Sequence, residues 1–170
     1  DGAAWRGSAA RLPLPVGRDI HGHDVILDLA KAPHLLVAGA TGSGKSVCLN
    51  SMIVSMLTRF TPGDLRLILV DPKIVEFRAF MGIPHLLVPV INDADTVPLA
   101  LRWLLREMER RYAWLADAGA RDIDAYNRRD DRRKPRNSSA NDEPPGHLPR
   151  IVLIIDELAD LMLTARNDVE

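Results

Sequence analysis

The chain has 170 residues, of which 46% are hydrophobic and 26% charged, the size and composition of one globular domain with a real core. Its 22 Lys and Arg nearly balance its 23 Asp and Glu, for a formal net charge of -1, so any site for nucleic acid or another polyanion must be local. The single cysteine, Cys48, excludes an intramolecular disulfide, and no apolar run reaches the roughly 20 residues of a membrane span; we therefore expect a cytoplasmic domain without membrane contact of its own, whose parent protein would carry any inner-membrane anchor elsewhere.

The first third of the chain predicts a hairpin, a strand and a helix. Residues 14–19 and 24–29 are short extended segments around a glycine-containing turn, a pattern typical of a β-hairpin. Residues 34–38 form a short apolar run before a glycine-rich stretch, which predicts a buried strand feeding a loop. Apolar residues then recur at helical spacing over residues 46–60.

The middle of the chain predicts two strands and a long helix. Residues 65–70 are a strand candidate in which 67–70 are an unbroken apolar run, which indicates a strand buried on both faces. Residues 86–91 are a further strand candidate. A helix is expected to begin at a cap, Asp93 or Asp95, and to end near Ala118. Its apolar residues are expected to pack in the core: Leu101, Leu104, Leu105, Met108, Tyr112 and Leu115.

The last part of the chain changes in amino-acid composition and then returns to a pattern typical of regular secondary structure. Residues 128–149 are a charge run followed by Asn, Ser, Pro and Gly, which predicts a mobile loop. Residues 151–155 are the most strand-like run in the chain, and residues 158–163 have a helical pattern. Strands that alternate with helices predict an α/β fold, with a mainly parallel sheet and helices on both faces, preceded by the β-hairpin.

A phosphate-binding loop is the most specific motif. It matches G-x-x-x-x-G-K-[ST] between a predicted strand and a predicted helix, as that motif requires. Its glycines let backbone N–H groups point at phosphates, and the helix N-terminus adds its positive dipole end. Lys45 is expected to reach the β- and γ-phosphates, and Ser46 to bind Mg²⁺. The alternative is a glycine-rich turn that contains Lys-Ser by chance. The predicted nucleotide-binding residues are Gly39, Ala40, Thr41, Gly42, Ser43, Gly44, Lys45, Ser46 and Val47.

Two acids follow the strand at residues 151–155, where a P-loop enzyme needs a second site for its metal. Asp156 is expected to hold Mg²⁺, usually through water, and Glu157 to orient the attacking water. With Lys45 they form the predicted catalytic set. The alternative is a strand that ends in acids capping the next helix. An acid after the aspartate favours ATP over GTP, and the chain has no Asn-Lys-x-Asp pattern for guanine.

A third motif, Asp71-Pro72-Lys73, closes the strand at residues 65–70. It is expected at the carboxyl edge of the sheet, where α/β proteins bind ligands. The alternative is a turn with solvent-exposed charges.

A basic run lies at residues 128–136, with six Lys or Arg among nine residues. Such a run can contact DNA phosphates. Asp130 and Asp131 interrupt it, however, and a solvated loop is the simpler interpretation.

Five linked motifs resemble the FtsK/SpoIIIE family of DNA translocases, from about Leu14 to the C-terminus. They lie at residues 33–39, 71–73, 82–87, 107–112 and 156–162. The resemblance implies a RecA-like ATPase that uses ATP and Mg²⁺, forms homo-hexamers around double-stranded DNA, and moves along it in chromosome segregation at cell division or sporulation. It also implies that Asp71 and Lys73 lie near the nucleotide or a subunit interface.

The resemblance divides the chain into an approach segment, residues 1–31, and a partial RecA-like domain, residues 32–170. The linker before residue 151 looks longer than is usual in the family. The family continues past Glu170 with a sensor strand, residues that act on a neighbour's ATP, and a winged-helix domain, so we expect a fragment with little ATPase activity of its own. Two alternatives are a plasmid-transfer or type VII secretion ATPase, and a nucleotide-binding assembly module without turnover.

Overall fold

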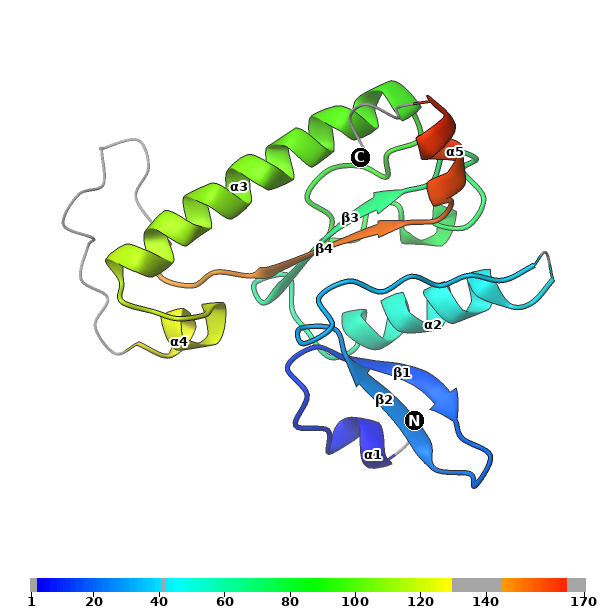
Figure 1. Cartoon of the computed structure of the whole chain (residues 1–170), viewed down its shortest axis with the longest axis horizontal. Coiled ribbons are helices and arrows are strands. Elements are labelled where there is room, and N and C mark those ends of the chain that lie inside the picture. The colour runs from blue at the N-terminus through cyan, green and yellow to red at the C-terminus, as the bar shows by residue number, and fades with distance from the viewer. Residues whose placement is uncertain (1–2, 41, 130–144, 165–170) are drawn as a thin grey trace. The chain divides into compact units, whose positions relative to one another are not determined.

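The structure is a computed structural model that describes residues 3–40, 42–129 and 145–164. The chain forms two compact units, Asp1–Thr61 and Pro62–Glu170 (Figure 1). The functional division between residues 31 and 32 that the sequence suggests stays a prediction.

The first unit contains the expected hairpin, preceded by a short helix, α1 (Ala3–Arg6). Strands β1 (Pro13–Arg18) and β2 (Asp24–Asp28) pair antiparallel. The Asp28 carboxylate accepts hydrogen bonds from the backbone N–H groups of Arg11, Leu12 and Ala30, at 3.0 to 3.2 Å. Burial opposes the charged form, but these N–H groups prevail and hold the pKa of Asp28 below its usual value. The base of the hairpin is thereby closed.

Helix α2 (Lys45–Leu57) follows the phosphate loop in the same unit (Figure 1). It buries Met52, Ile53 and Met56 and packs against β1. Arg59, just past its end, donates to the carbonyl oxygens of Trp5 and Ser8 at 2.8 and 2.9 Å. The predicted helix at residues 46–60 is confirmed, except that it begins one residue earlier and ends at Leu57.

The strand expected at residues 34–38 is wrong, because these residues have no regular secondary structure. Leu36 is 78% exposed and Leu35 41%. A strand is stabilised by its ladder, and in this unit β1 and β2 pair with one another. Residues 34–38 therefore have the apolar composition of a strand, but among the described residues of their own unit no strand pairs with them.

The second unit is built on a parallel pair, β3 (Leu65–Val70) and β4 (Arg150–Ile155), which are in register along their whole length (Figure 1). Leu67, Ile68, Leu69 and Val70 are all at most 1% exposed, so β3 is buried on both faces as its continuous apolarity predicts. The expected third strand at residues 86–91 is reduced to two parallel bridges, Leu67 with Leu86 and Val70 with Ile91. Pro89, which has no N–H to donate, lies between them.

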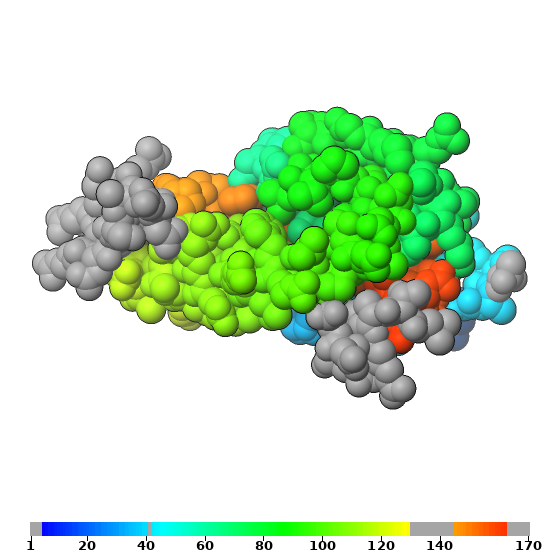
Figure 2. Space-filling model, turned by 90° about the horizontal axis from the view of Figure 1, so that it is seen from above, coloured from blue at the N-terminus to red at the C-terminus, as the bar shows by residue number. Residues whose placement is uncertain are grey.

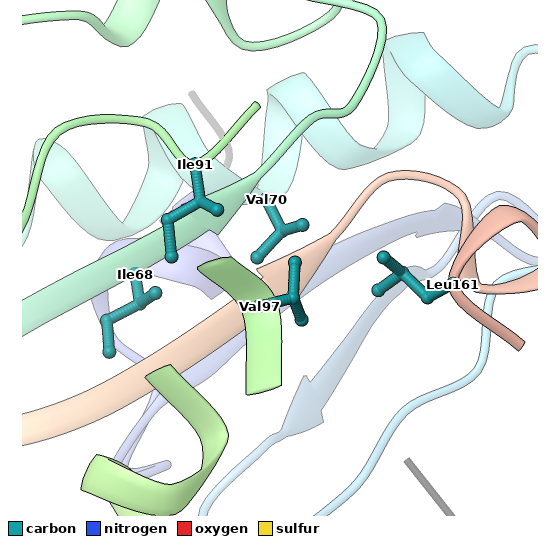
Figure 3. Packing of buried hydrophobic residues seen from close by; sticks show 5 residues of the cluster. All are labelled: Ile68, Val70, Ile91, Val97 and Leu161. Carbon is teal, nitrogen blue, oxygen red and sulfur yellow. The ribbon is translucent and has the colours of Figure 1, made fainter. Parts of the chain in front are cut away.

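The long helix α3 (Val97–Asp117) is confirmed. A 3-10 turn, Ala94–Thr96, precedes it, and Asp93 caps that turn by accepting from the Asp95 backbone N–H at 3.1 Å. The start of α3 packs on the sheet. Figure 3 shows the Val97 side chain of α3 beside Val70 of β3, with Leu161 of α5 in the same cluster. Helix α5 (Leu158–Thr164) agrees with the predicted helical stretch.

The apolar stripe expected on α3 is wrong in part. Leu105, Met108 and Tyr112 are 56%, 45% and 63% exposed, and the outer side of the helix lies on the surface (Figure 2). Glu107 is buried instead, because Arg110 and Arg111 pair with its carboxylate. Arg111 also donates to the Pro149 carbonyl oxygen at 2.6 Å, which joins α3 to the residue before β4.

A short helix that the sequence does not predict, α4 (Ile123–Arg128), follows α3. Asp122 caps it by accepting from the Ala125 N–H at 2.7 Å. The side chain of Asn127 both donates to and accepts from the backbone of Leu148, and Tyr126 donates to the Pro145 carbonyl oxygen at 2.8 Å. Residues 145–149, expected in the mobile loop, are thus held against α4. Residues 130–144, with most of the basic run, lie outside the described residues.

The architecture confirms an α/β fold with a parallel sheet and a preceding β-hairpin. Within the described residues, no helix combines the length and apolarity that crossing a membrane requires.

Candidate functional site

The phosphate loop of the first unit folds tightly on itself. Gly42 and Gly44 have φ of 82° and 94°, a left-handed conformation that glycine adopts without steric cost. The Ser43 N–H donates to the Ala40 carbonyl oxygen at 2.9 Å. A Cβ added at Gly39 would lie 2.2 Å from the Ser43 Oγ, so any larger residue there would force the Ser43 side chain to move. Thr41, the remaining variable position of the loop, lies outside the described residues.

The loop delivers the chain into the N-terminus of α2. Gly44 is the N-cap, and in the described part of the chain no side chain caps the first turn, which also holds no acidic residue. The N–H groups there and the helix dipole favour an anion. Lys45 and Ser46 are half-buried in this first turn, and Val47 is 70% exposed. A tight loop with two glycines at positive φ that ends in an uncapped helix fits a nucleotide phosphate.

The predicted acid pair lies at the carboxyl edge of the sheet in the second unit. The Asp156 N–H donates to the Val70 carbonyl oxygen at 3.0 Å, which extends the β3–β4 ladder by one bond. Asp156 and Glu157 are both half-buried. Glu157 Oε1 lies 3.4 Å from the Ala159 N–H, a long contact of the kind expected if an acid caps α5. Asp156 is thus held by strand pairing and Glu157 by the start of a helix.

Lys73 lies at the same edge as the acids. Its Nζ is 2.9 Å from Asp160 Oδ2, on the first turn of α5. The hydrogen bond and charge of Asp160 raise the pKa of Lys73, and the charges of Glu157 and Asp156 add to the effect. Asp160 was not anticipated as a site residue. Its position in the first turn of the helix predicted directly after the acid pair is the signal that could have found it.

Asp71, two residues before Lys73, is completely buried. Its Oδ2 accepts from the Phe77 N–H at 2.9 Å, which closes the loop after β3. The structure therefore brings Asp71, Lys73, Asp156 and Glu157 to one edge of one sheet. Residues 39–47 belong to the other unit, and a role of both groups in a single site stays a prediction.

The residues present fit Mg²⁺ as well as nucleotide. Among the described residues, no three His, Cys, Asp or Glu side chains are grouped as a self-sufficient metal site. Mg²⁺ in nucleotide enzymes is bound by one or two protein oxygens, substrate phosphates and water. The Ser46 hydroxyl and the Asp156 carboxylate are the oxygens expected for this role.

The phosphate loop and the parallel sheet edged by acids are features of the P-loop nucleotide-binding fold. The model of the FtsK/SpoIIIE family matches residues 1–170. The chain belongs to that family.

Curated relatives agree with this assignment. The chain is 48% identical over 168 residues to the DNA translocase SftA of Bacillus subtilis, covering 99% of this chain and 17% of that protein. It is 47% identical over 166 residues to the DNA translocase FtsK of Oceanobacillus iheyensis, covering 98% and 21%. The chain thus spans about a fifth of the length of these relatives.

Two solved structures share the fold. The pCW3 conjugation coupling protein TcpA, in a monomer form with ATPγS, superimposes with a TM-score of 0.69 at 29% identity, over 93% of this chain and 39% of that one. The cytoplasmic domain of the type VII secretion ATPase EccC from Thermomonospora curvata gives 0.72 at 28% identity, over 98% and 20%.

Proposed function

We propose that this chain is the ATP-binding and hydrolysing core of a double-stranded DNA translocase. The observation that carries the proposal is the cradle formed by Gly39, Gly42 and Gly44 at the uncapped start of α2. Family membership and about 47% identity to proteins named DNA translocases support the DNA-directed part.

Each residue of the proposed site has a chemical task. Backbone N–H groups of the loop and the start of α2 bind the phosphates, and Lys45 neutralises charge on the β- and γ-phosphates. Ser46 and Asp156 hold Mg²⁺, which when bound neutralises the charge that develops on the phosphate oxygens. Glu157 orients the attacking water and accepts its proton.

Relatives named DNA translocases support DNA as the partner. We propose double-stranded DNA as the track, a homo-hexamer as the working assembly, and chromosome segregation at division or sporulation as the role. Asp71 and Lys73 would serve near the nucleotide or a subunit interface.

A second candidate comes from the structural likeness to a conjugation coupling protein and a secretion ATPase. Identity to these is 28–29%, against 46–51% for the proteins named DNA translocases. The higher identity favours translocation of DNA over transfer of a plasmid or secretion of a protein. An assembly module that binds nucleotide without turnover is the remaining alternative.

The test is ATP hydrolysis by the full-length protein with duplex DNA, with an unfolded polypeptide, and with neither. We expect stimulation by DNA alone, and its loss in Lys45→Ala. Lys31→Ala is the matched control, because Lys31 is an exposed lysine in the same unit and outside the loop. Stimulation by polypeptide would favour the secretion alternative. Binding of ATP without turnover under all three conditions would favour the assembly module.

A further inference from the structure

The loop between β3 and residue 77 is closed by buried hydrogen bonds. Asp71, which is completely buried, donates its N–H to the Ile91 carbonyl oxygen at 2.9 Å. Its carboxylate accepts from the N–H of Phe77, also completely buried, at 2.9 Å. Its carbonyl oxygen accepts from the Ile74 N–H at 3.1 Å. One residue therefore fixes both ends of a loop in which Lys73 is the only Lys or Arg.

Ile74, directly after Lys73, has a φ of 53°. Positive φ is uncommon for residues other than glycine and is a real outlier for a β-branched one. Such strain persists where the surroundings impose it, and it is concentrated at functional sites. The loop is thus folded into a specific shape in spite of a local cost. That shape sets the direction in which the chain leaves Lys73.

Lys73 connects this loop to α5, the helix that directly follows the acid pair. Its Nζ lies 2.9 Å from Asp160 Oδ2, although the two side chains are 62% and 38% exposed. Asp160 is in the first turn of α5, three residues after Glu157. Leu161, the next residue, is completely buried in the sheet cluster (Figure 3). The ion pair therefore acts on the first turn of α5, which directly follows Glu157.

Exposed ion pairs contribute little to folding, because solvent screens them and two long side chains lose freedom. The contact between Lys73 and Asp160 is therefore a poor device for stability. It is well placed, however, to restrain the first turn of α5, where Glu157 also makes a long contact to the Ala159 N–H. The raised pKa of Lys73, caused first by Asp160 and then by Glu157 and Asp156, agrees with a lysine that stays charged beside all three acids.

We propose that Lys73 is a positioning residue, which through Asp160 holds the first turn of α5 so that Glu157 is correctly placed toward the attacking water. The inference rests on the proposed function, because it assigns Lys73 to the same hydrolytic step. Lys73 does not touch the reacting atoms in this role. It acts through the helix.

The test measures kcat and KM for ATP, and the Kd of ATP, in the full-length protein with duplex DNA. Small misplacements of a reacting group cost up to about a hundredfold in rate, so Lys73→Ala should lower kcat by about ten- to a hundredfold while KM and Kd stay within about twofold. Asp160→Asn should lower kcat similarly. Lys73→Arg should restore most of the loss, and Lys73→Ala combined with Asp160→Asn should be no worse than either alone.

The matched control is Arg18→Ala, which removes another exposed ion pair of 2.9 Å, between Arg18 and Asp24 of the hairpin. It should leave kcat unchanged. An unchanged kcat in Lys73→Ala would overturn the inference. So would a large rise in Kd at constant kcat, since Lys73 would then bind the nucleotide itself.

Two further outcomes keep the inference separate from folding and from the proposed function. If Lys73→Ala unfolds, Asp160→Asn decides in its place, and a wild-type kcat there overturns the inference. Wild-type protein that binds ATP but never hydrolyses it refutes the proposed function, and with it any positioning role. Hydrolysis by wild type with indifferent Lys73 and Asp160 variants refutes the positioning role alone.

Discussion

Replacing Asp71 by alanine should release the loop after β3. The Asp71 side chain is completely buried and accepts from the Phe77 N–H at 2.9 Å, and Phe77 is also completely buried. Alanine removes the acceptor, and no water replaces it at a buried N–H. An unsatisfied buried donor costs about 1–3 kcal/mol. Because the loop is short, we expect the cost to act first on local opening and only then on global unfolding.

The matched variant is Asp71→Asn, which keeps the side-chain shape and a carbonyl oxygen to accept from Phe77. Its amide nitrogen would replace Oδ1, which has no hydrogen-bond partner among the described residues. Asparagine thus leaves one donor unsatisfied where alanine loses the bridge that closes the loop. We expect the asparagine variant to lie between wild type and alanine.

The measurement is hydrogen exchange of the Phe77 amide, followed by mass spectrometry of a peptide over residues 71–77 in the full-length protein. A loss of about 1–3 kcal/mol corresponds to exchange about 5- to 150-fold faster. Peptides from the hairpin should exchange at the wild-type rate. Wild-type protection in the alanine variant would show that the carboxylate does not hold the loop. Equal rates for asparagine and alanine would show that its acceptor oxygen is not the cause.

Three further changes test other parts of the molecule. Lys45→Ala should weaken Mg-ATP binding in calorimetry while Lys31→Ala does not, and unchanged affinity would contradict the phosphate-loop assignment. Glu157→Gln should bind ATP but hydrolyse it about 10²- to 10⁴-fold more slowly; wild-type turnover would move the base to another residue. Tyr126→Phe removes the hydrogen bond to the Pro145 carbonyl oxygen, at about 1 kcal/mol, and a thermal midpoint unchanged or raised would show that this contact does not anchor residues 145–149.

The strands of the second unit could be predicted because continuous apolar runs leave a pattern that is hard to mistake. Residues 67–70 and 151–155 are such runs, and they lie in the predicted strands β3 and β4. The hairpin was equally readable, since its turn contains Gly22, which has a φ of 82°. The acids at 156 and 157 followed directly, because parallel strands place their carboxyl ends at one edge.

The wrong prediction of a strand at residues 34–38 shows that composition does not identify the partner with which a segment pairs. Apolar character indicates that a segment can pair, whereas the ladder depends on which partner the chain brings to it. The α3 stripe failed for a related reason. Leu105, Met108 and Tyr112 were assigned to the core by their apolar character, yet the buried face includes Glu107, whose charge is balanced by Arg110 and Arg111. Pairing of charges is a tertiary property that hydropathy does not report.

The candidate site likewise has parts that the sequence predicts and a contact that it does not predict. The glycines of the phosphate loop and the acid pair belong to contiguous motifs, and a motif can be read from one stretch of sequence. Lys73 and Asp160, which are in contact, are 87 residues apart in the sequence (160 minus 73). It depends on β3 and β4 lying side by side, so the sequence offered only the position of Lys73 and not its partner.

Residues with left-handed backbone occur both in the phosphate loop and in the loop after β3, but for different physical reasons. In the phosphate loop it falls on Gly42 and Gly44, which as glycines adopt this conformation without steric cost. After β3 it falls on Ile74, where no close backbone approach is needed and the side chain is 41% exposed. A glycine there would relieve the strain but add freedom to the segment that carries Lys73. An isoleucine held at positive φ by Asp71 and Phe77 keeps that segment in one shape, which is what a residue that acts by position requires.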